Sequence, residues 1–149
     1  MPRPHLLALL LAAAMPAACT PPPSAPEPPT SPPEVRLPES VRLLEVPEAA
    51  ALLQNTPGLV IVDLREDWEI RKFGRISRSV WVDALNDERL QKGLAALDPQ
   101  KPHLLYCALG GRSRQVAATL AGRGFTQLHL LSGGLEAWLA AGQAVEKGS

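Results

Sequence analysis

This sequence has few reactive and metal-binding side chains: its 149 residues include two cysteines, three histidines and no Cys-x-x-Cys pair. It also lacks a glycine-rich nucleotide loop, and no spacing among His5, His103 and His129 suggests a metal site or a cysteine–histidine dyad. The 15 basic and 15 acidic residues balance, and neither sign forms a block, which argues against a nucleic-acid or acidic-membrane surface. We therefore expect one domain at most, with no cofactor, no metal and no nucleic-acid partner.

The sequence also has no apolar run long enough to cross a membrane. The run at residues 6–15 would span about 15 Å as a helix, which is half of a bilayer core. Arg3 precedes this run and small residues follow it, which is typical of a signal peptide. We predict that residues 1–18 are a signal peptide and that the protein is exported. The alternative is a buried amino-terminal helix of the domain.

Cys19 ends this segment and follows Ala17 and Ala18 directly. Small residues before a cysteine resemble the lipobox of bacterial lipoproteins, although Pro16 stands where that motif usually has leucine. The resemblance implies cleavage before Cys19 and a lipid anchor on it, so that a membrane is an expected partner. Thr20, in place of an acidic residue, favours the outer membrane, on the periplasmic face of the cell envelope. Cleavage after an Ala-x-Ala site, without a lipid, is the alternative.

Proline, with serine, threonine and glutamate, dominates residues 19–38. This segment has too few apolar side chains to offset the entropy of ordering it, and its prolines favour extended polyproline II. At about 3.1 Å per residue, it could hold a domain up to about 55 Å from a membrane. We predict a disordered tether, and the alternative is a proline motif that a partner recognises.

From Val41 onward, strand-like and helix-like segments alternate. Continuous apolar runs are typical of strands buried on both faces, and turn residues separate them from amphipathic segments. The expected strands are residues 41–46, 59–63, 80–82, 103–106 and 127–131, and the expected helices are residues 47–53, 66–73, 87–97, 113–123 and 135–141. This alternation predicts an α/β domain at residues 39–145, with a mostly parallel five-stranded sheet flanked by helices, and a tail at residues 146–149.

Three reactive or ionisable side chains lie at the carboxyl ends of predicted strands. They are Asp63, Asp83 and Cys107. Sites in open α/β sheets lie beyond these strand ends, so the three side chains could converge there.

The histidines and tryptophans of the predicted domain have simpler interpretations. His103 and His129 lie at or within predicted strands, and we expect them to be structural or at the surface. We expect Trp68, Trp81 and Trp138 to lie in the core rather than to contact a cofactor.

The stretch at residues 103–114 combines a thiol with an anion-binding backbone. A short apolar run ends in Cys107, Gly110 and Gly111 follow, and a helix is expected from Ser113. A thiol reacts as its thiolate, and a helix N-terminus and a nearby guanidinium both stabilise an anion. The two glycines let successive backbone amides turn inward, and Arg112 supplies the guanidinium. The alternative is that Cys107 is a small buried hydrophobic residue.

These motifs resemble those of the rhodanese family. Cys107 to Ser113 resembles the active-site loop Cys-x-x-Gly-x-Arg-Ser of that family, and Asp63 with Arg65 resembles its Asp-x-Arg strand end. The pair Trp68–Glu69 and the closing Gly-Gly-x-x-x-Trp motif at residues 133–138 follow in the family's order and spacing. The resemblance covers most of residues 41–142 and implies a rhodanese-like three-layer α/β domain.

The chain departs from the family at residues 74–79. Gly-Arg-Ile-Ser-Arg-Ser stands where Gly-His-Ile-x-Gly-Ala is usual, so Arg78 replaces a small residue. We expect altered packing or an altered rim of the active site there. Substrate specificity is expected at that rim, where Leu109, Arg114, Arg75 and Arg78 are candidates.

The resemblance implies a sulfurtransferase that forms a persulfide on Cys107. The residue would take sulfur from a donor such as thiosulfate and pass it to an acceptor such as cyanide or a thiol. The backbone amides of Ala108, Leu109, Gly110, Gly111, Arg112 and Ser113 would stabilise the persulfide, and Arg112 would help to position the anionic donor. Asp63 and Arg65 would form an ion pair that supports the loop. Because Cys19 is the only other cysteine, Cys107 is expected to persist as a free thiol outside the cytoplasm.

Two other functions remain open. Phosphatases and arsenate reductases related to this fold place five residues between cysteine and arginine, whereas this chain has four, residues 108–111. The four-residue gap favours a pocket for one sulfur atom over a pocket for a tetrahedral oxyanion. The other alternative is a non-catalytic rhodanese-like binding module in the cell envelope.

Overall fold

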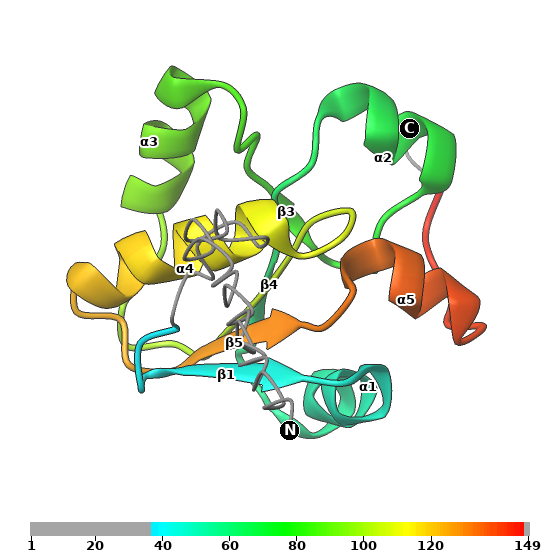
Figure 1. Ribbon diagram of the computed structural model, residues 1–149, viewed down its shortest axis with the longest axis horizontal. Helices are drawn as coiled ribbons and strands as arrows, with labels where there is room; N and C mark the ends of the chain where they lie inside the picture. Colours follow the sequence, from blue (N-terminus) through cyan, green and yellow to red (C-terminus); the bar gives the residue numbers. More distant parts are fainter. Residues whose placement is uncertain (1–36, 148–149) are drawn as a thin grey trace, which may run out of the picture. The chain divides into compact units, whose positions relative to one another are not determined.

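Five short strands build one sheet in the computed structural model, which describes residues 37–147 (Figure 1). In chain order the strands are β1 (Val41–Leu44), β2 (Val60–Asp63), β3 (Val80–Trp81), β4 (His103–Tyr106) and β5 (Leu128–Leu131). Their order in the sheet is β1-β5-β4-β2-β3, and every pairing is parallel. The predicted signal peptide, Cys19 and residues 19–36 of the predicted tether lie outside the described residues.

Helices connect the strands, as the alternating sequence pattern predicts. They are α1 (Val46–Asn55), α2 (Asp67–Phe73), α3 (Asp87–Ala95), α4 (Gly111–Gly122) and α5 (Gly134–Ala140). The α/β class and the five-stranded sheet are therefore confirmed, and the sheet is parallel throughout the described residues.

Several predicted element boundaries differ from the structure, and two of the differences have identifiable reasons. The first strand ends at Leu44 because Glu45 caps α1 and exchanges capping hydrogen bonds with Glu48, which places Val46 inside the helix. Helix α4 begins at Gly111 rather than Ser113, since Gly110 has a φ of 108° and serves as the N-cap.

The sheet separates two apolar clusters. One cluster packs α3 and α4 against one face of the sheet and includes Leu105, Val116 and Leu120. The other packs α1 and α5 against the opposite face and includes Leu104 and Trp138. This arrangement gives three layers, helices on both sides of the sheet, which Figure 1 shows with α4 and α1 on opposite sides. Strand β4 lies between β5 and β2 and all four of its residues are buried, so the segment after it starts from the centre of the fold.

The expectation that all three tryptophans lie in the core is wrong for two of them. Trp138 is 4% exposed, whereas Trp68 is 56% and Trp81 is 37% exposed. Trp81 donates its indole N–H to the backbone carbonyl of Arg65 at 2.8 Å, and its ring lies under the guanidinium of Arg89. At the short edge strand β3, polar contacts rather than burial therefore hold the indole of Trp81 in place.

The carboxyl-terminal part of the described chain returns to the domain. Glu146 pairs with Arg75 in an isolated antiparallel bridge, with both backbone hydrogen bonds at 2.8 Å. The predicted domain ends at residue 145, but this backbone pairing shows that it extends to Glu146. Within residues 37–147, no helix is long and apolar enough to span a membrane, and no group of three or more potential metal ligands occurs.

Candidate active site

Cys107 follows β4 directly and begins a tight loop that closes on the start of α4. Its Sγ accepts a hydrogen bond from the backbone N–H of Gly110 at 3.0 Å. Gly110 has a positive φ of 108°, a conformation that an L-residue rarely adopts, where the loop turns into α4. Cys107 is a free thiol with only 1% of its surface exposed. The loop therefore holds the sulfur against a backbone donor at a helix N-terminus, as the sequence analysis predicts.

Ser113 stabilises the same loop from the first turn of α4. Its hydroxyl is fully buried and donates to the carbonyl of Gly110 at 3.0 Å, and its Oγ lies 3.8 Å from Sγ of Cys107. Ser113 thus fixes the conformation of Gly110, whose amide contacts the sulfur. Of the other predicted loop residues, Ala108 is partly exposed, Leu109 forms the exposed tip and Gly111 is exposed.

Arg112 forms an ion pair across the site with Glu69 of α2. Its Nη1 and Nη2 donate to the two carboxylate oxygens of Glu69 at 2.7 and 2.8 Å, and both side chains are largely buried. The hydrogen bond from Arg112 lowers the pKa of Glu69 below its usual range, against the opposing effect of burial. The same bond raises the pKa of Arg112, with a smaller effect from charge on Cys107. The guanidinium therefore stays charged and oriented beside the cysteine loop.

Glu69 itself is placed by the first turn of α2. Its carboxylate accepts the backbone N–H of Glu66, the N-cap residue, at 2.9 Å, which completes a capping box. One carboxylate therefore joins the start of α2 to the start of α4. Glu69 belongs to the Trp68–Glu69 family motif, but no local pattern indicates its partner 43 residues later.

Asp63 and Arg65 form the predicted ion pair, and both are fully buried. Arg65 Nε and Nη2 donate to the two oxygens of Asp63 at 2.9 and 2.6 Å, and Nη2 also donates to the carbonyl of Gly74 at 2.7 Å. The hydroxyl of Tyr106 donates to Asp63 at 2.6 Å. Burial would lower the pKa of Arg65, but the bonds to Asp63 outweigh it and hold the pKa above its usual value. Burial and the neighbouring Asp63 also raise the pKa of Tyr106.

This network lies under the loop rather than in contact with the sulfur. Tyr106 immediately precedes Cys107 and also accepts the backbone N–H of Ile76 at 3.1 Å, so the network connects β2, β4 and the segment after α2. Asp83 is placed elsewhere: it accepts the backbone N–H of Leu85 and pairs loosely with Arg89 at 3.9 Å. The three strand ends share one edge of the sheet, but neither carboxylate forms a polar contact with Cys107 among the described residues. The three side chains therefore do not form one hydrogen-bonded group in the described part of the chain.

Helix α5 anchors the cysteine loop from behind, which the sequence analysis misses. The backbone N–H groups of Leu135 and Glu136 donate to the carbonyls of Cys107 and Ala108 at 2.8 and 3.1 Å. A Cβ atom on Gly134 would lie 2.4 Å from the Cys107 carbonyl oxygen, so only glycine allows this approach. Gly134 of the closing Gly-Gly-x-x-x-Trp motif is therefore part of the site.

An apolar pocket of about 210 Å³ borders the loop between α2 and α5. Phe73, Leu135 and Leu139 form its apolar walls, and Ala108 lies at its edge. Of the residues expected at the rim, Arg75 is held by its bridge to Glu146, and Arg78 lines a different pocket that no residue of the cysteine loop borders.

Comparisons with known proteins agree with this geometry. Residues 46–141 match a family model described as the rhodanese-like domain. The thiosulfate sulfurtransferase GlpE of Stutzerimonas stutzeri (strain A1501) is 36% identical over 92 residues, which cover 62% of this chain and 80% of that protein.

Two solved structures have similar folds. A protein from Rhodopseudomonas palustris, described as a possible tyrosine phosphatase of unknown function, is 30% identical, with a TM-score of 0.61 over 72% of this chain and 86% of that one. The polysulfide-sulfur transferase homodimer of Wolinella succinogenes is 25% identical, with a TM-score of 0.60 over 72% of this chain and 79% of that one. The family model covers strands β2 to β5, the cysteine loop and the helix that anchors it. The chain therefore belongs to the rhodanese-like domain family.

Proposed function

We propose that this protein is an exported sulfurtransferase that carries sulfane sulfur as a persulfide on Cys107. The observation that carries the proposal is the sulfur of Cys107 held by the Gly110 amide at the N-terminus of α4, with an oriented Arg112 beside it. Similarity to thiosulfate sulfurtransferases supports the reaction class.

In the first half-reaction, the Cys107 thiolate attacks the outer sulfur of a donor such as thiosulfate. A new sulfur–sulfur bond forms, the donor's own sulfur–sulfur bond breaks, and sulfite leaves with the electron pair. The positive end of α4 and the backbone amides of the loop offset the negative charge on the sulfur. Arg112, kept charged by Glu69, attracts the anionic donor and stays in place because both carboxylate oxygens hold it.

In the second half-reaction, cyanide or a thiolate attacks the outer sulfur of the persulfide. The product is thiocyanate or an acceptor persulfide, and the electron pair of the broken bond returns to Cys107 as its thiolate. The enzyme ends in its starting state, so that donor and acceptor react in turn and ping-pong kinetics are expected.

Intact-mass measurement after incubation with thiosulfate tests the proposal. The wild-type protein should gain about 32 Da, one sulfur atom, and should lose it again on addition of cyanide. Cys107→Ser should show neither change, and Ser113→Ala, which keeps the nucleophile, should still gain the sulfur. Sulfur transfer that survives in Cys107→Ser would contradict the mechanism.

The same proteins distinguish the two other functions. Hydrolysis of an aryl phosphate without persulfide formation would favour a phosphatase, the class named for the relative from Rhodopseudomonas palustris. A wild-type protein that neither gains sulfur nor hydrolyses phosphate would favour the non-catalytic binding module.

The export part of the proposal rests on residues 1–18 and Cys19. A lipid on Cys19 would anchor the domain at the periplasmic face of the outer membrane. The full-length protein should then partition into the detergent phase, and Cys19→Ala should move it to the aqueous phase. Equal partitioning of both forms would contradict lipid anchoring.

A further inference from the structure

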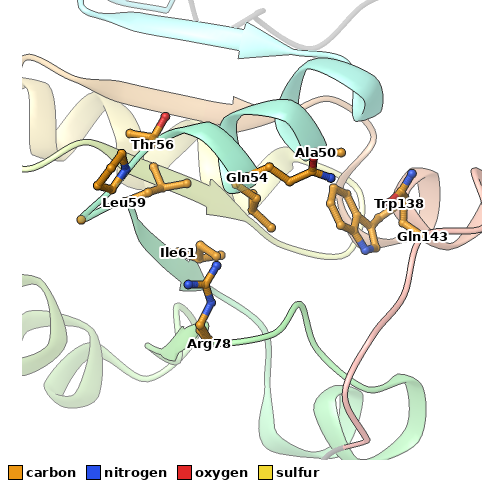
Figure 2. Close-up of a pocket in the computed structure, with 11 residues that line it drawn as sticks. Ala50, Gln54, Thr56, Leu59, Ile61, Arg78, Trp138 and Gln143 are labelled. Atoms are coloured by element: carbon orange, nitrogen blue, oxygen red, sulfur yellow. The ribbon is translucent and has the colours of Figure 1, made fainter.

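A second pocket, of about 500 Å³, lies between α1, the start of β2 and α5 (Figure 2). Figure 2 shows Gln54 and Thr56 on the α1 side, Trp138 on α5 and Arg78 extending toward Ile61 from the loop before β3. No residue of the cysteine loop lines it. Its size lies in the usual range for small-molecule sites.

The lining of this pocket combines an apolar floor with a single charge. Leu53, Leu59 and Ile61 supply aliphatic surface, and Trp138 closes one end. Arg78 is the only charged side chain among the lining residues, which include no aspartate or glutamate. The remaining polar groups are one hydroxyl and two carboxamides, from Thr56, Gln54 and Gln143. The pocket therefore carries a net positive charge next to aliphatic surface.

Arg78 is unusual both in its backbone and in its side chain. Its φ of 61° makes it the only non-glycine residue with a positive φ among residues 37–147. A glycine, which the family motif has at this position, adopts this conformation without steric strain. The Arg78 side chain forms no hydrogen bond or ion pair with another described residue, in contrast to Arg65 and Arg112. A strained residue that presents an unpaired guanidinium to a pocket points to a ligand.

We propose that this pocket binds a small organic monocarboxylate with an apolar alkyl or aryl body. The carboxylate pairs with the guanidinium of Arg78, whose planar fork fits two carboxylate oxygens. The apolar body lies on Leu53, Leu59 and Ile61, and the carboxamides of Gln54 and Gln143 lie on the Trp138 side of the pocket (Figure 2). Because Arg78 is a cation with no acidic side chain beside it in the pocket, a ligand with one negative charge should bind better than a neutral ligand.

Titration with 3-phenylpropanoate, followed by NMR on the full-length protein, tests this proposal. The indole N–H of Trp138, which donates to the carbonyl of Ala144, should shift with saturation, while the amides of the cysteine loop should not. The neutral analogue 3-phenylpropanamide, of nearly the same size, should bind at least tenfold more weakly.

Two variants of Arg78 separate binding from folding. Arg78→Gln should lower the affinity for 3-phenylpropanoate at least tenfold, and so should Arg78→Gly, which relieves the backbone strain and so should remain folded. Arg71→Gln removes an exposed arginine of α2 outside the pocket and should bind as the wild type does. Equal binding by Arg78→Gly and wild type, equal binding of the amide, or shifts centred on the cysteine loop would each overturn the proposal.

The catalytic nucleophile provides an independent control. Cys107→Ser should bind 3-phenylpropanoate with unchanged affinity, because Cys107 does not line the pocket. Failure of the sulfurtransferase mechanism would leave this result intact, and loss of carboxylate binding would leave the persulfide assay intact.

Discussion

The arginines beside the cysteine loop differ from Arg78 in how their charge is satisfied. Arg65 is paired with Asp63 and Arg112 with Glu69, each through two guanidinium nitrogens. Arg78 has no such partner among the described residues and lies at an open pocket. A guanidinium held by a carboxylate fixes the geometry around it, whereas an unpaired one remains available to an incoming anion. Arg112 would thus meet an anionic donor in an orientation that Glu69 fixes, whereas Arg78 is presented to its pocket without a partner.

The two regions also differ in how much stability the fold should lose when a charged side chain is removed. The paired arginines are buried or largely buried, so removal of a partner leaves a charge that water compensates poorly. Arg78 is exposed, and its removal leaves no such charge. The comparison predicts large effects at the first region and small ones at the second.

The largest effect is expected for Asp63→Ala. This change leaves the fully buried Arg65 without its ion-pair partner and removes the closer of the two acceptors of Tyr106, so the free energy of unfolding should fall by about 3–5 kcal/mol. Urea unfolding at neutral pH measures it. The control is Asp67→Ala, which removes the exposed pair with Arg71 and should cost less than about 1 kcal/mol. Similar losses for both variants would break the contrast between buried and exposed pairs.

A smaller effect is expected for Glu69→Gln, and it should appear in activity. The neutral amide no longer holds Arg112 with two charged hydrogen bonds, so kcat/KM for thiosulfate should fall by about tenfold to a hundredfold. Glu136→Gln removes a carboxylate next to the same loop without breaking a described ion pair, and should leave kcat/KM within about twofold of the wild type. An equal loss in both variants would indicate that net charge, rather than the position of Arg112, matters.

The Glu69–Arg112 pair also predicts a pH dependence of stability. The folded-state pKa of Glu69 is lowered, so the stabilisation that it supplies should be fully present above the ordinary value of 4.5 and lost as pH falls through the lower folded-state pKa. The difference in unfolding free energy between wild type and Glu69→Gln should thus be constant at neutral pH and shrink in acid. Urea unfolding between pH 7 and pH 3 measures it. The difference in unfolding free energy between wild type and Arg78→Gln should not change with pH. If it also shrank in acid, the pH dependence could not be assigned to Glu69.

The smallest effect is expected for the stability of Arg78→Gly. Glycine relieves the strain of a positive φ but adds entropy to the unfolded chain, so the unfolding free energy should stay the same or rise by up to about 1 kcal/mol. Thermal and urea unfolding check this result. A loss of more than about 1 kcal/mol would show that the Arg78 side chain stabilises the fold, and would reduce the contrast with Arg65.

Most of the fold follows from the sequence because its signals are local. The apolar run of β4 has the predicted boundaries, since all of its residues are buried and a polar turn precedes it. The first strand is too long in the prediction because glutamate, rather than serine or threonine, caps α1. Trp68 and Trp81 show the limit of residue type as a guide to burial: both rings lie at the surface, where their N–H groups find polar partners.

Only the part of the candidate site that lies within one loop can be predicted from the sequence, because only there are the signals local. Cys107, Gly110, Arg112 and Ser113 are adjacent in the chain, so their geometry is encoded within one loop. Contacts from Glu69 and from α5 join segments far apart in sequence, and no local pattern specifies which carboxylate or which amide will meet the loop.

The packing of α5 against the cysteine loop also determines when all hydrogen bonds that hold the loop can form. The ribosome makes Cys107 before it makes Gly134, Leu135 and Glu136, whose backbone holds the carbonyls of Cys107 and Ala108. Until those residues have been made, the carbonyls of Cys107 and Ala108 lack their partners on α5. The loop reaches its final shape only when the last helix of the described chain has packed, so chemical competence should arise as a late event in maturation, together with the completed core.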